Sequence, residues 1–193
     1  MEFLNAKGTK DINPEDKIVM DEIVNAIKNI FELYGYNPLD TPILERFEVL
    51  SSKYAGGSEI LKETFKLKDQ GDRILGLRYD LTVPLARFIA MNPNLKLPFK
   101  RYQIGKVFRD GPVSSNRIRE FTQCDVDIIG AKSLVYDAEI LAITNDIFKK
   151  LNFKFNIKIN NRKILDALLN EYNLKDKDKA IIALDKLSKI GEK

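Results

Sequence analysis

Two stretches of the sequence, 99–109 and 119–129, place polar and charged residues at every second position. The later stretch has the alternating set Arg119, Phe121, Gln123, Asp125 and Asp127. The earlier stretch has the alternating set Arg101, Gln103 and Arg109. Successive side chains of a β-strand point to opposite faces, so each set would share one face of its strand. If the two faces coincide, the sheet presents arginines, an aromatic ring, an amide and carboxylates together.

A sheet face of this composition has the chemistry of a ligand site, because desolvated charges are costly unless they are paired or bind a ligand. An arginine at the end of a strand, as Arg109 would be, can hold a phosphate bidentately. Phe121 can stack on a flat base, and Gln123 and Asp127 can accept hydrogen bonds from an ammonium group or a nitrogen ring. The pattern favours a nucleotide beside a small cationic molecule. The alternative is that Arg109 and Asp127 form ion pairs within the sheet and Phe121 belongs to the core.

A second polar group, Arg78-Tyr79-Asp80-Leu81-Thr82, follows a predicted strand. Asp80 and Thr82 alternate, so they would share a face. An isolated aspartate at such a place more often caps a helix than binds a ligand. Both roles therefore stay open for Asp80.

The composition excludes several other chemistries. Among 193 residues there is no histidine and a single cysteine, Cys124. A histidine-dependent triad, an imidazole base, an intrachain disulfide and a four-ligand zinc site are therefore excluded or nearly so. One cysteine suits a reducing, cytoplasmic setting. The first residues do not resemble a signal peptide, and no apolar run is long enough to predict a membrane span.

Charge is uneven along the chain. The formal net charge is only +4, which does not by itself indicate nucleic acid, but residues 149–193 hold 12 basic and 6 acidic side chains. The plain interpretation of this tail is a solvated lysine-rich face. Contact with RNA is the sharper alternative.

Hydrophobic spacing and turn residues predict the elements that would hold the polar sets. A helix is expected over 14–34, with Asn13 as its N-cap and Gly35 ending it. Other helices are expected over 81–91 and 134–151, at the start of 46–63 before the Gly56-Gly57 loop, and twice within 161–190. Strands are expected within 36–45, in a hairpin around Gln70-Gly71, in the long hairpin of 99–109 and 119–129, and over 153–159. This order predicts an α+β fold with a mixed, mainly antiparallel sheet flanked by helices, without Rossmann alternation or a P-loop.

Five segments resemble known motifs in collinear order. The run 102–130, YQIGKVFRDGPVSSNRIREFTQCDVDIIG, resembles motif 2 of class II aminoacyl-tRNA synthetases, and most closely the histidyl-tRNA synthetase family. YGYNPLDTPILE at 34–45 resembles motif 1, and LRYDLTVPLAR at 77–87 resembles that family's strand-to-helix element. KGTKDINPED at 7–16 and NNRKIL at 160–165 are similar to its opening stretch and to the segment after motif 2.

The resemblance implies a two-step ligase that joins histidine to ATP and then passes the aminoacyl group to the 3′ end of tRNA, usually with Mg²⁺. It implies that Arg109 is the catalytic arginine on the α-phosphate and that Phe121 stacks on adenine. Arg117 and Arg119 would contact ATP and the acceptor stem. The implied histidine-binding residues are Asp80, Thr82 and Gln123 for the ammonium group and Asp127 for the imidazole. The implied tRNA-binding residues are Ser114, Ser115, Asn116 and Arg117, and motif 1 would form a homodimer.

The sequence also departs from this pattern. Motif 2 commonly has a carboxylate two residues after its arginine, which is related to the adenine amino group or the metal, and here that position is Gly111. Ile118 stands where a tyrosine is common. Motif 3, a second histidine-binding segment and the anticodon-binding domain are not found. We therefore expect a class II synthetase-like catalytic core over 1–150 and the start of a helical insertion over 151–193, incomplete at the C-terminus.

Such a chain alone is expected to be inactive or very weak in the ligase reaction. An alternative is a non-catalytic module similar to this family, either a histidine-sensing regulatory subunit or the RNA-binding part of a kinase. A third interpretation, a plain dimerisation domain, rests on motif 1 only and leaves the polar sheet face unexplained.

Overall fold

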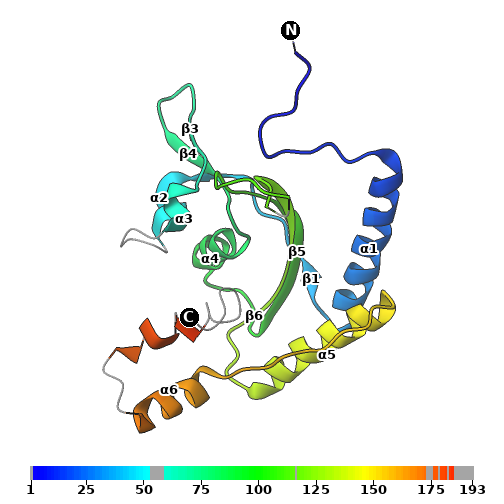
Figure 1. Ribbon diagram of the computed structural model, residues 1–193, viewed down its shortest axis with the longest axis vertical. Helices are drawn as coiled ribbons and strands as arrows, with labels where there is room; N and C mark the ends of the chain where they lie inside the picture. The colour runs from blue at the N-terminus through cyan, green and yellow to red at the C-terminus, as the bar shows by residue number, and fades with distance from the viewer. Residues whose placement is uncertain are drawn as a thin grey trace. The chain divides into compact units, whose positions relative to one another are not determined.

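The computed structural model describes residues 2–52, 59–115, 117–172, 176–177, 179–181 and 183–184. The chain divides into two compact units, Met1–Lys154 and Phe155–Lys193. The first unit contains two small sheets with helices around them, shown in Figure 1. Within the described residues, no helix combines the length and the apolar character that crossing a membrane requires.

The first helix, α1 (Pro14–Leu33), confirms the sequence prediction at both ends. The side chain of Asn13 caps it by accepting a hydrogen bond from the backbone N–H of Asp16 at 2.8 Å. Gly35, with φ of +78°, ends it in the left-handed conformation that glycine adopts without strain. The helix buries Phe31 in a cluster with Tyr36, Tyr102 and Ile143.

The larger sheet has the strand order β1-β5-β6. β5 (Phe99–Phe108) and β6 (Glu120–Ile129) form the long antiparallel hairpin predicted from the sequence, and β1 (Asn37–Pro38) pairs parallel to β5. The even-numbered side chains of the hairpin face the core, where Tyr102, Ile104, Val126 and Ile128 pack with α1 and α5 (Leu134–Lys150). The odd-numbered side chains lie on the other face, as strand alternation requires.

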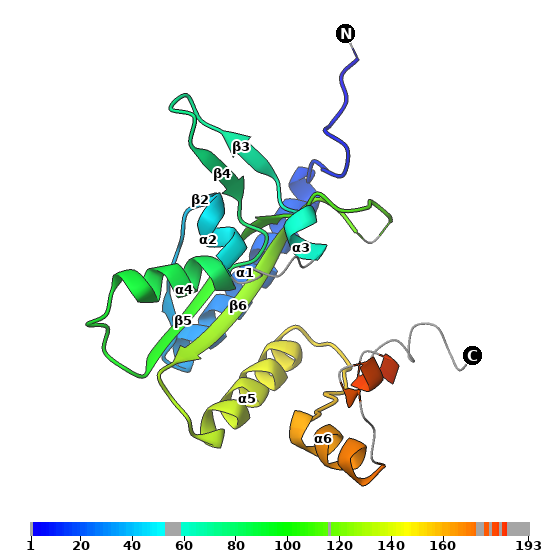
Figure 2. The same cartoon turned by 90° about the vertical axis from the view of Figure 1, so that its left-hand side faces the viewer.

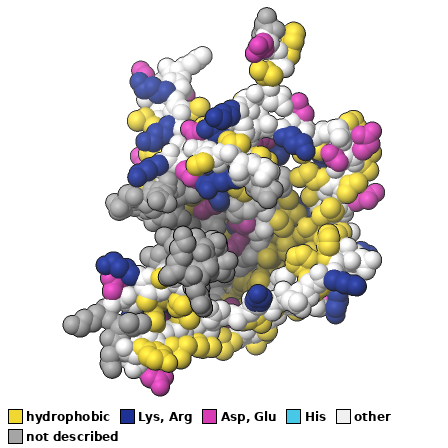
Figure 3. All heavy atoms as spheres, viewed as in Figure 1, with side chains coloured by type: hydrophobic (Ala, Val, Ile, Leu, Met, Phe, Trp, Pro, Cys, Tyr) yellow, Lys and Arg dark blue, Asp and Glu magenta, His cyan; other side chains and the backbone are white. Residues whose placement is uncertain are grey.

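The smaller sheet has the order β2-β4-β3, and all of its pairs are antiparallel. Its strands are β2 (Leu44–Arg46), β3 (Lys66–Lys68) and β4 (Ile74–Leu77). The β3–β4 pair confirms the predicted hairpin, and Figure 3 shows basic side chains along it. Helices α2 (Phe47–Ser52), α3 (Glu59–Lys62) and α4 (Thr82–Met91) accompany this sheet. The mixed, mainly antiparallel α+β fold is therefore confirmed.

The predicted strand over 153–159 is wrong. Residues 153–160 form no regular element, although their alternation suits a strand. The N–H of Phe153 donates to the carbonyl of Phe148 in α5 at 3.0 Å instead of joining a strand ladder. In the second unit, α6 (Arg162–Glu171) is capped by Asn161, whose side chain accepts a hydrogen bond from the N–H of Lys163 at 2.9 Å. The second predicted tail helix lies largely outside the described residues, and the Gly56-Gly57 loop lies wholly outside them.

Candidate functional site

The two polar sets of the sequence meet on one face of the β5–β6 hairpin. Its register pairs Arg101 with Asp127, Gln103 with Asp125, Gly105 with Gln123, and Val107 with Phe121. Beyond the last ladder pair, the backbone N–H of Arg109 donates to the carbonyl of Arg119 at 2.8 Å. The coincidence of faces on which the ligand-site hypothesis depended is thus confirmed.

At one end of this face, Asp127 forms an ion pair within the sheet, but with Arg101 rather than with Arg109. Nη2 of Arg101 lies 2.6 Å from Oδ2 of Asp127 without the alignment of a hydrogen bond. The Arg101 side chain has no solvent exposure, and its Nε and Nη1 atoms have no partner among the described residues. Burial raises the pKa of Asp127 above its ordinary value, and the neighbouring Arg101 charge only partly opposes this.

At the other end, Arg109 lies over the ring of Phe121. The guanidinium carbon is 5.1 Å from the ring centre, and Nε donates to the carbonyl oxygen of Tyr79 at 3.2 Å. Arg109, Arg117, Ile118 and Phe121 line one cavity of about 610 Å³. Phe121 is only partly buried, so its ring is not a core residue. A cationic group and an aromatic face in one cavity suit a phosphate and a base.

The second polar group lies next to the Arg101–Asp127 pair. Nη2 of Arg101 donates to the carbonyl of Leu81 at 3.3 Å, so the segment between Asp80 and Thr82 adjoins the hairpin. Asp80 is buried, and its Oδ1 accepts from the N–H of Val83 at 3.0 Å. This bond supports the first turn of α4, so the capping role that the sequence left open is present. Thr82 is exposed at the start of the same helix.

Gln123 lies between the two ends of the face, and its amide donates to Asp125 at 2.9 Å. Opposite Gln123, position 105 has room only for glycine. A Cβ atom at this position would lie 2.5 Å from Nη2 of the buried Arg78. Arg78 crosses from β4 to β5 and donates through Nε to the carbonyl of Lys106 at 2.8 Å.

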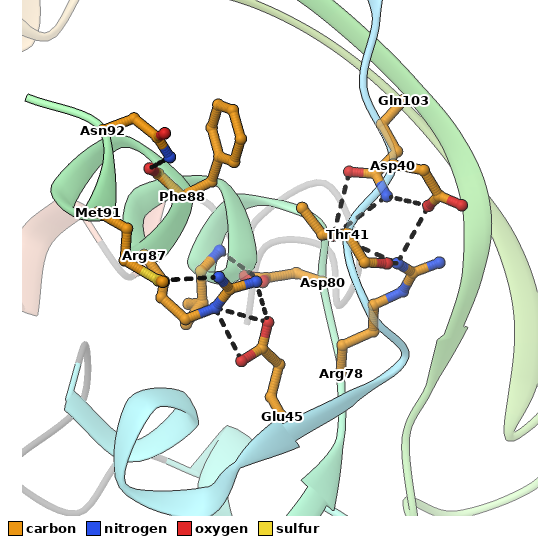
Figure 4. A network of polar contacts seen from close by, with 11 residues as sticks. Asp40, Thr41, Glu45, Arg78, Asp80, Arg87, Phe88, Met91, Asn92 and Gln103 are labelled. Carbon is orange, nitrogen blue, oxygen red and sulfur yellow. Dashed lines mark hydrogen bonds and ion pairs between the residues drawn. The ribbon is translucent and has the colours of Figure 1, made fainter. Parts of the chain in front are cut away.

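Two polar networks support the strand ends beside the site. Arg78 also donates to the backbone carbonyl of Thr41 and lies 3.7 Å from Asp40, and Figure 4 shows this group. In the same view, the guanidinium of Arg87 reaches both oxygens of the buried Glu45 at 2.7–2.9 Å. The second contact ties α4 to β2.

The loop between β5 and β6 brings its arginines to carboxylates. Arg119 pairs with Asp110 at 2.9 Å, and Arg117 donates to both carboxylate oxygens of Glu63 at 2.7 and 2.8 Å. Ser114 and Ser115 are exposed. Asn116, the remaining residue predicted to bind tRNA, lies outside the described residues.

No role was assigned from the sequence to two residues that contact the candidate site, Arg101 and Glu63. Arg101 appeared only as a member of an alternating set, although its place opposite Asp127 could have been read from the hairpin register. Glu63 carried no signal at all, because it comes from a segment far from the motif 2-like run and contacts it only in the folded chain.

Known proteins resemble this chain over nearly its whole length. The family model described as histidyl-tRNA synthetase matches residues 8–188. The chain is 52% identical over 193 residues to histidine–tRNA ligase 1 of Bacillus cereus, covering 99% of this chain and 45% of that protein. It is 46% identical over 194 residues to histidine–tRNA ligase 2 of Shouchella clausii, covering 100% of this chain and 46% of that protein.

Solved structures of similar proteins also match this chain. Histidyl-tRNA synthetase from Nostoc is 34% identical with a TM-score of 0.84, over 99% of this chain and 43% of that one. A Bacillus halodurans structure described as an ATP phosphoribosyltransferase regulatory subunit/histidyl-tRNA synthetase is 28% identical with a TM-score of 0.69, over 79% of this chain and 39% of that one. The chain thus spans less than half the length of these relatives.

Proposed function

Since the chain belongs to the histidyl-tRNA synthetase family, we propose that it supplies the motif 1 and motif 2 part of a histidine–tRNA ligase active site. The reaction would activate histidine with ATP, release pyrophosphate and transfer the aminoacyl group to tRNA. The observation that carries this proposal is the shared odd-numbered face of β5 and β6, where Arg109 and Phe121 adjoin one cavity and Gln123 and Asp127 follow along the same strand.

The nucleotide would bind in the cavity of Arg109 and Phe121. Arg109 would hold the α-phosphate and stabilise the charge that develops as histidine attacks it. Phe121 would stack on adenine, and Arg117 and Arg119 would complete the contacts to ATP and the acceptor stem. Positioning and charge stabilisation can drive this phosphoryl chemistry without a general base, which agrees with a chain that has no histidine.

Histidine would bind beside the Arg101–Asp127 pair. Asp80, Thr82 and Gln123 would bind its ammonium group, and Asp127 would accept from an imidazole N–H. The link from Arg101 to the Leu81 carbonyl supports this arrangement, because it brings the two groups of residues to one place. A partly buried carboxylate selects against near-isosteres, since a side chain without the N–H leaves it unpaired.

Mg²⁺ is implied by ATP chemistry, but the described residues contain no cluster of three carboxylates or thiols that could hold a metal ion. Mg²⁺ commonly binds through substrate phosphates and water with only one or two carboxylates, so the ion would enter with ATP and would neutralise part of the phosphate charge. The exposed loop of Ser114, Ser115 and Arg117 would contact the tRNA acceptor end, and the motif 1-like segment 34–45 would contribute to a homodimer. A cytoplasmic setting suits both partners.

Histidine-dependent ATP–pyrophosphate exchange tests the function on the protein as its gene encodes it. The 193 residues alone are expected to show little or no exchange. In a protein that joins them to the catalytic segments not found in this sequence, we expect exchange specific to histidine and a loss of about 100-fold or more on Arg109→Ala, because one preorganised donor to a developing charge has this magnitude. Arg46→Ala is the matched control, because Arg46 is exposed and pairs only with Glu48 in the described part of the chain. Exchange that is unaffected by Arg109→Ala would exclude the assigned role.

The second candidate is a histidine-sensing regulatory subunit, favoured by the likeness to the Bacillus halodurans structure. Calorimetry separates the two candidates. ATP binding that weakens on Arg109→Ala supports the ligase. Histidine binding without any ATP binding supports the sensor.

A further inference from the structure

The space above Gly111 is filled by the carboxylate of Glu63. A Cβ atom at position 111 would lie 2.8 Å from Oε1 and 2.9 Å from Oε2 of this side chain. Such distances are shorter than van der Waals contact, so no side chain fits at position 111 while Glu63 is in place. Gly111 is buried, and the Glu63 carboxylate occupies the space that a side chain at this position would need.

Glu63 is held there from two sides. Its backbone carbonyl accepts from the N–H of Asp110 at 2.7 Å, which joins the end of α3 to the loop that follows β5. Its two carboxylate oxygens accept from Nη2 of Arg117 at 2.7 and 2.8 Å, and its side chain is 21% exposed. Figure 2 shows α3 beside the upper end of β6. A carboxylate therefore lies directly against position 111, where motif 2 commonly has one, although it comes from another part of the chain.

We propose that Glu63 is the residue that selects adenine over other bases, replacing the carboxylate that position 111 lacks. The inference rests on the proposed function, because it takes the cavity of Arg109 and Phe121 as the ATP site. Arg117 lines that cavity and donates to the Glu63 carboxylate, so a single side chain separates the carboxylate from the cavity. A carboxylate only accepts hydrogen bonds. It therefore matches the 6-amino group of adenine and repels the 6-oxo group of hypoxanthine or guanine.

A purely structural role for Glu63 makes a different prediction. If the side chain only held Arg117 and the loop, its removal would weaken the binding of all nucleoside triphosphates equally. A base-selecting role weakens ATP binding alone. The ratio of ATP to ITP affinity separates the two roles, because the two nucleotides share their triphosphate and ribose.

Calorimetry of the protein as its gene encodes it, with ATP and with ITP, measures this ratio for the wild type and for Glu63→Gln. The amide keeps the shape but loses the charge, and we expect ATP binding to weaken about tenfold while ITP binding stays equal or improves, since a hydrogen bond to a charged acceptor has this magnitude. Glu120→Gln is the matched control, because Glu120 pairs with Lys106 on the even-numbered positions of the same hairpin. Equal weakening of ATP and ITP would overturn the proposal.

An exchange of the two positions gives an independent readout. Gly111→Glu alone should weaken ATP binding, because the new side chain collides with Glu63. The double variant Glu63→Ala/Gly111→Glu should recover the preference for ATP, whereas Glu63→Ala alone should lack it. A double variant no better than Glu63→Ala overturns the proposal. A wild type that binds neither nucleotide would instead contradict the proposed function.

Discussion

Arg101 is a fully buried guanidinium opposite the carboxylate proposed to bind imidazole. Burial raises the pKa of Asp127, the Arg101 charge opposes that rise, and the Asp125 charge adds to it. Arg101 thus favours the ionised state of Asp127, which is the state that can accept from a ring N–H. Arg101 also donates to the carbonyl of Leu81, so the same side chain contacts the residue that precedes α4.

We predict that Arg101→Met raises the pKa of Asp127 further and weakens histidine binding about tenfold at neutral pH, because a charged acceptor is lost. In the wild type, affinity falls as pH drops through the native pKa of Asp127, and in the variant this fall begins at a higher pH. The native pKa lies above the unfolded value, so unfolding free energy decreases as pH rises between the two, and the variant extends that window upward. Calorimetry between about pH 5 and 8 measures the shift relative to the wild type.

Arg101→Lys is the control, because it keeps a positive charge at the same place. We expect its pH profile to lie closer to that of the wild type. If Arg101→Met leaves the pH profile of histidine binding unchanged, Asp127 does not bind the ligand through its charge.

At the scale of elements, the helices and strands that could be predicted from the sequence are those marked by caps and by hydrophobic periodicity. Asn13 and Gly35 fixed the ends of α1, and two-residue periodicity identified both hairpin strands together with the side chains that share a face. Each of these signals involves residues that are close together in the sequence, so it can be recognised without knowing the fold. Strand 153–159 failed for the opposite reason, because its existence depends on a partner elsewhere in space. Glu63 was missed on the same ground, since its position depends on the packing of α3 against the β5–β6 loop.

Helix α5 is tied to β5 by a small polar cluster. Glu139 accepts from Nζ of Lys100 and from the hydroxyl of Tyr36, each at 2.7 Å. Burial by itself would raise the pKa of Glu139, but these two hydrogen bonds outweigh it and lower the pKa. The ammonium group of Lys100 also lies 4.5 Å from the centre of the Tyr36 ring. The cluster therefore stabilises the docked helix through the ionised carboxylate.

We predict that Glu139→Gln lowers the free energy of unfolding by about 1–2 kcal/mol at neutral pH. A lowered native pKa gives stability that is present above the unfolded value of about 4.3 and is lost as pH falls through the native pKa. The difference between wild type and variant should therefore shrink below about pH 4. Urea unfolding followed by circular dichroism at both pH values measures it. Asp137→Asn, on an exposed position of the same helix, should change stability by less than about 0.5 kcal/mol.

At the scale of the whole molecule, apolar side chains remain exposed on α1 and at the start of the smaller sheet. Ile18 and Val19 on α1 are 60% and 55% exposed, and Ile43 and Leu44 are 42% and 50% exposed. The second pair belongs to the segment 34–45 that resembles motif 1. Exposed apolar side chains that are neighbours in one segment, as Ile43 and Leu44 are, suit a contact with another molecule. This distribution supports the proposal that a second copy of the chain covers the segment.

We predict that the protein as its gene encodes it is a dimer and that Leu44→Asp weakens its association about 100-fold or more, because a charge would enter an apolar interface without a partner. Sedimentation velocity across a concentration series measures the dissociation constant, and thermal unfolding checks that the variant remains folded. Ile74→Asp is the matched control, because Ile74 is 58% exposed but lies in β4, outside the segment 34–45. A dimer equally stable in wild type and Leu44→Asp would place the interface elsewhere, and a monomeric wild type would exclude it. The first result would still leave Arg109 and Phe121 in their cavity, since that site is formed within one chain.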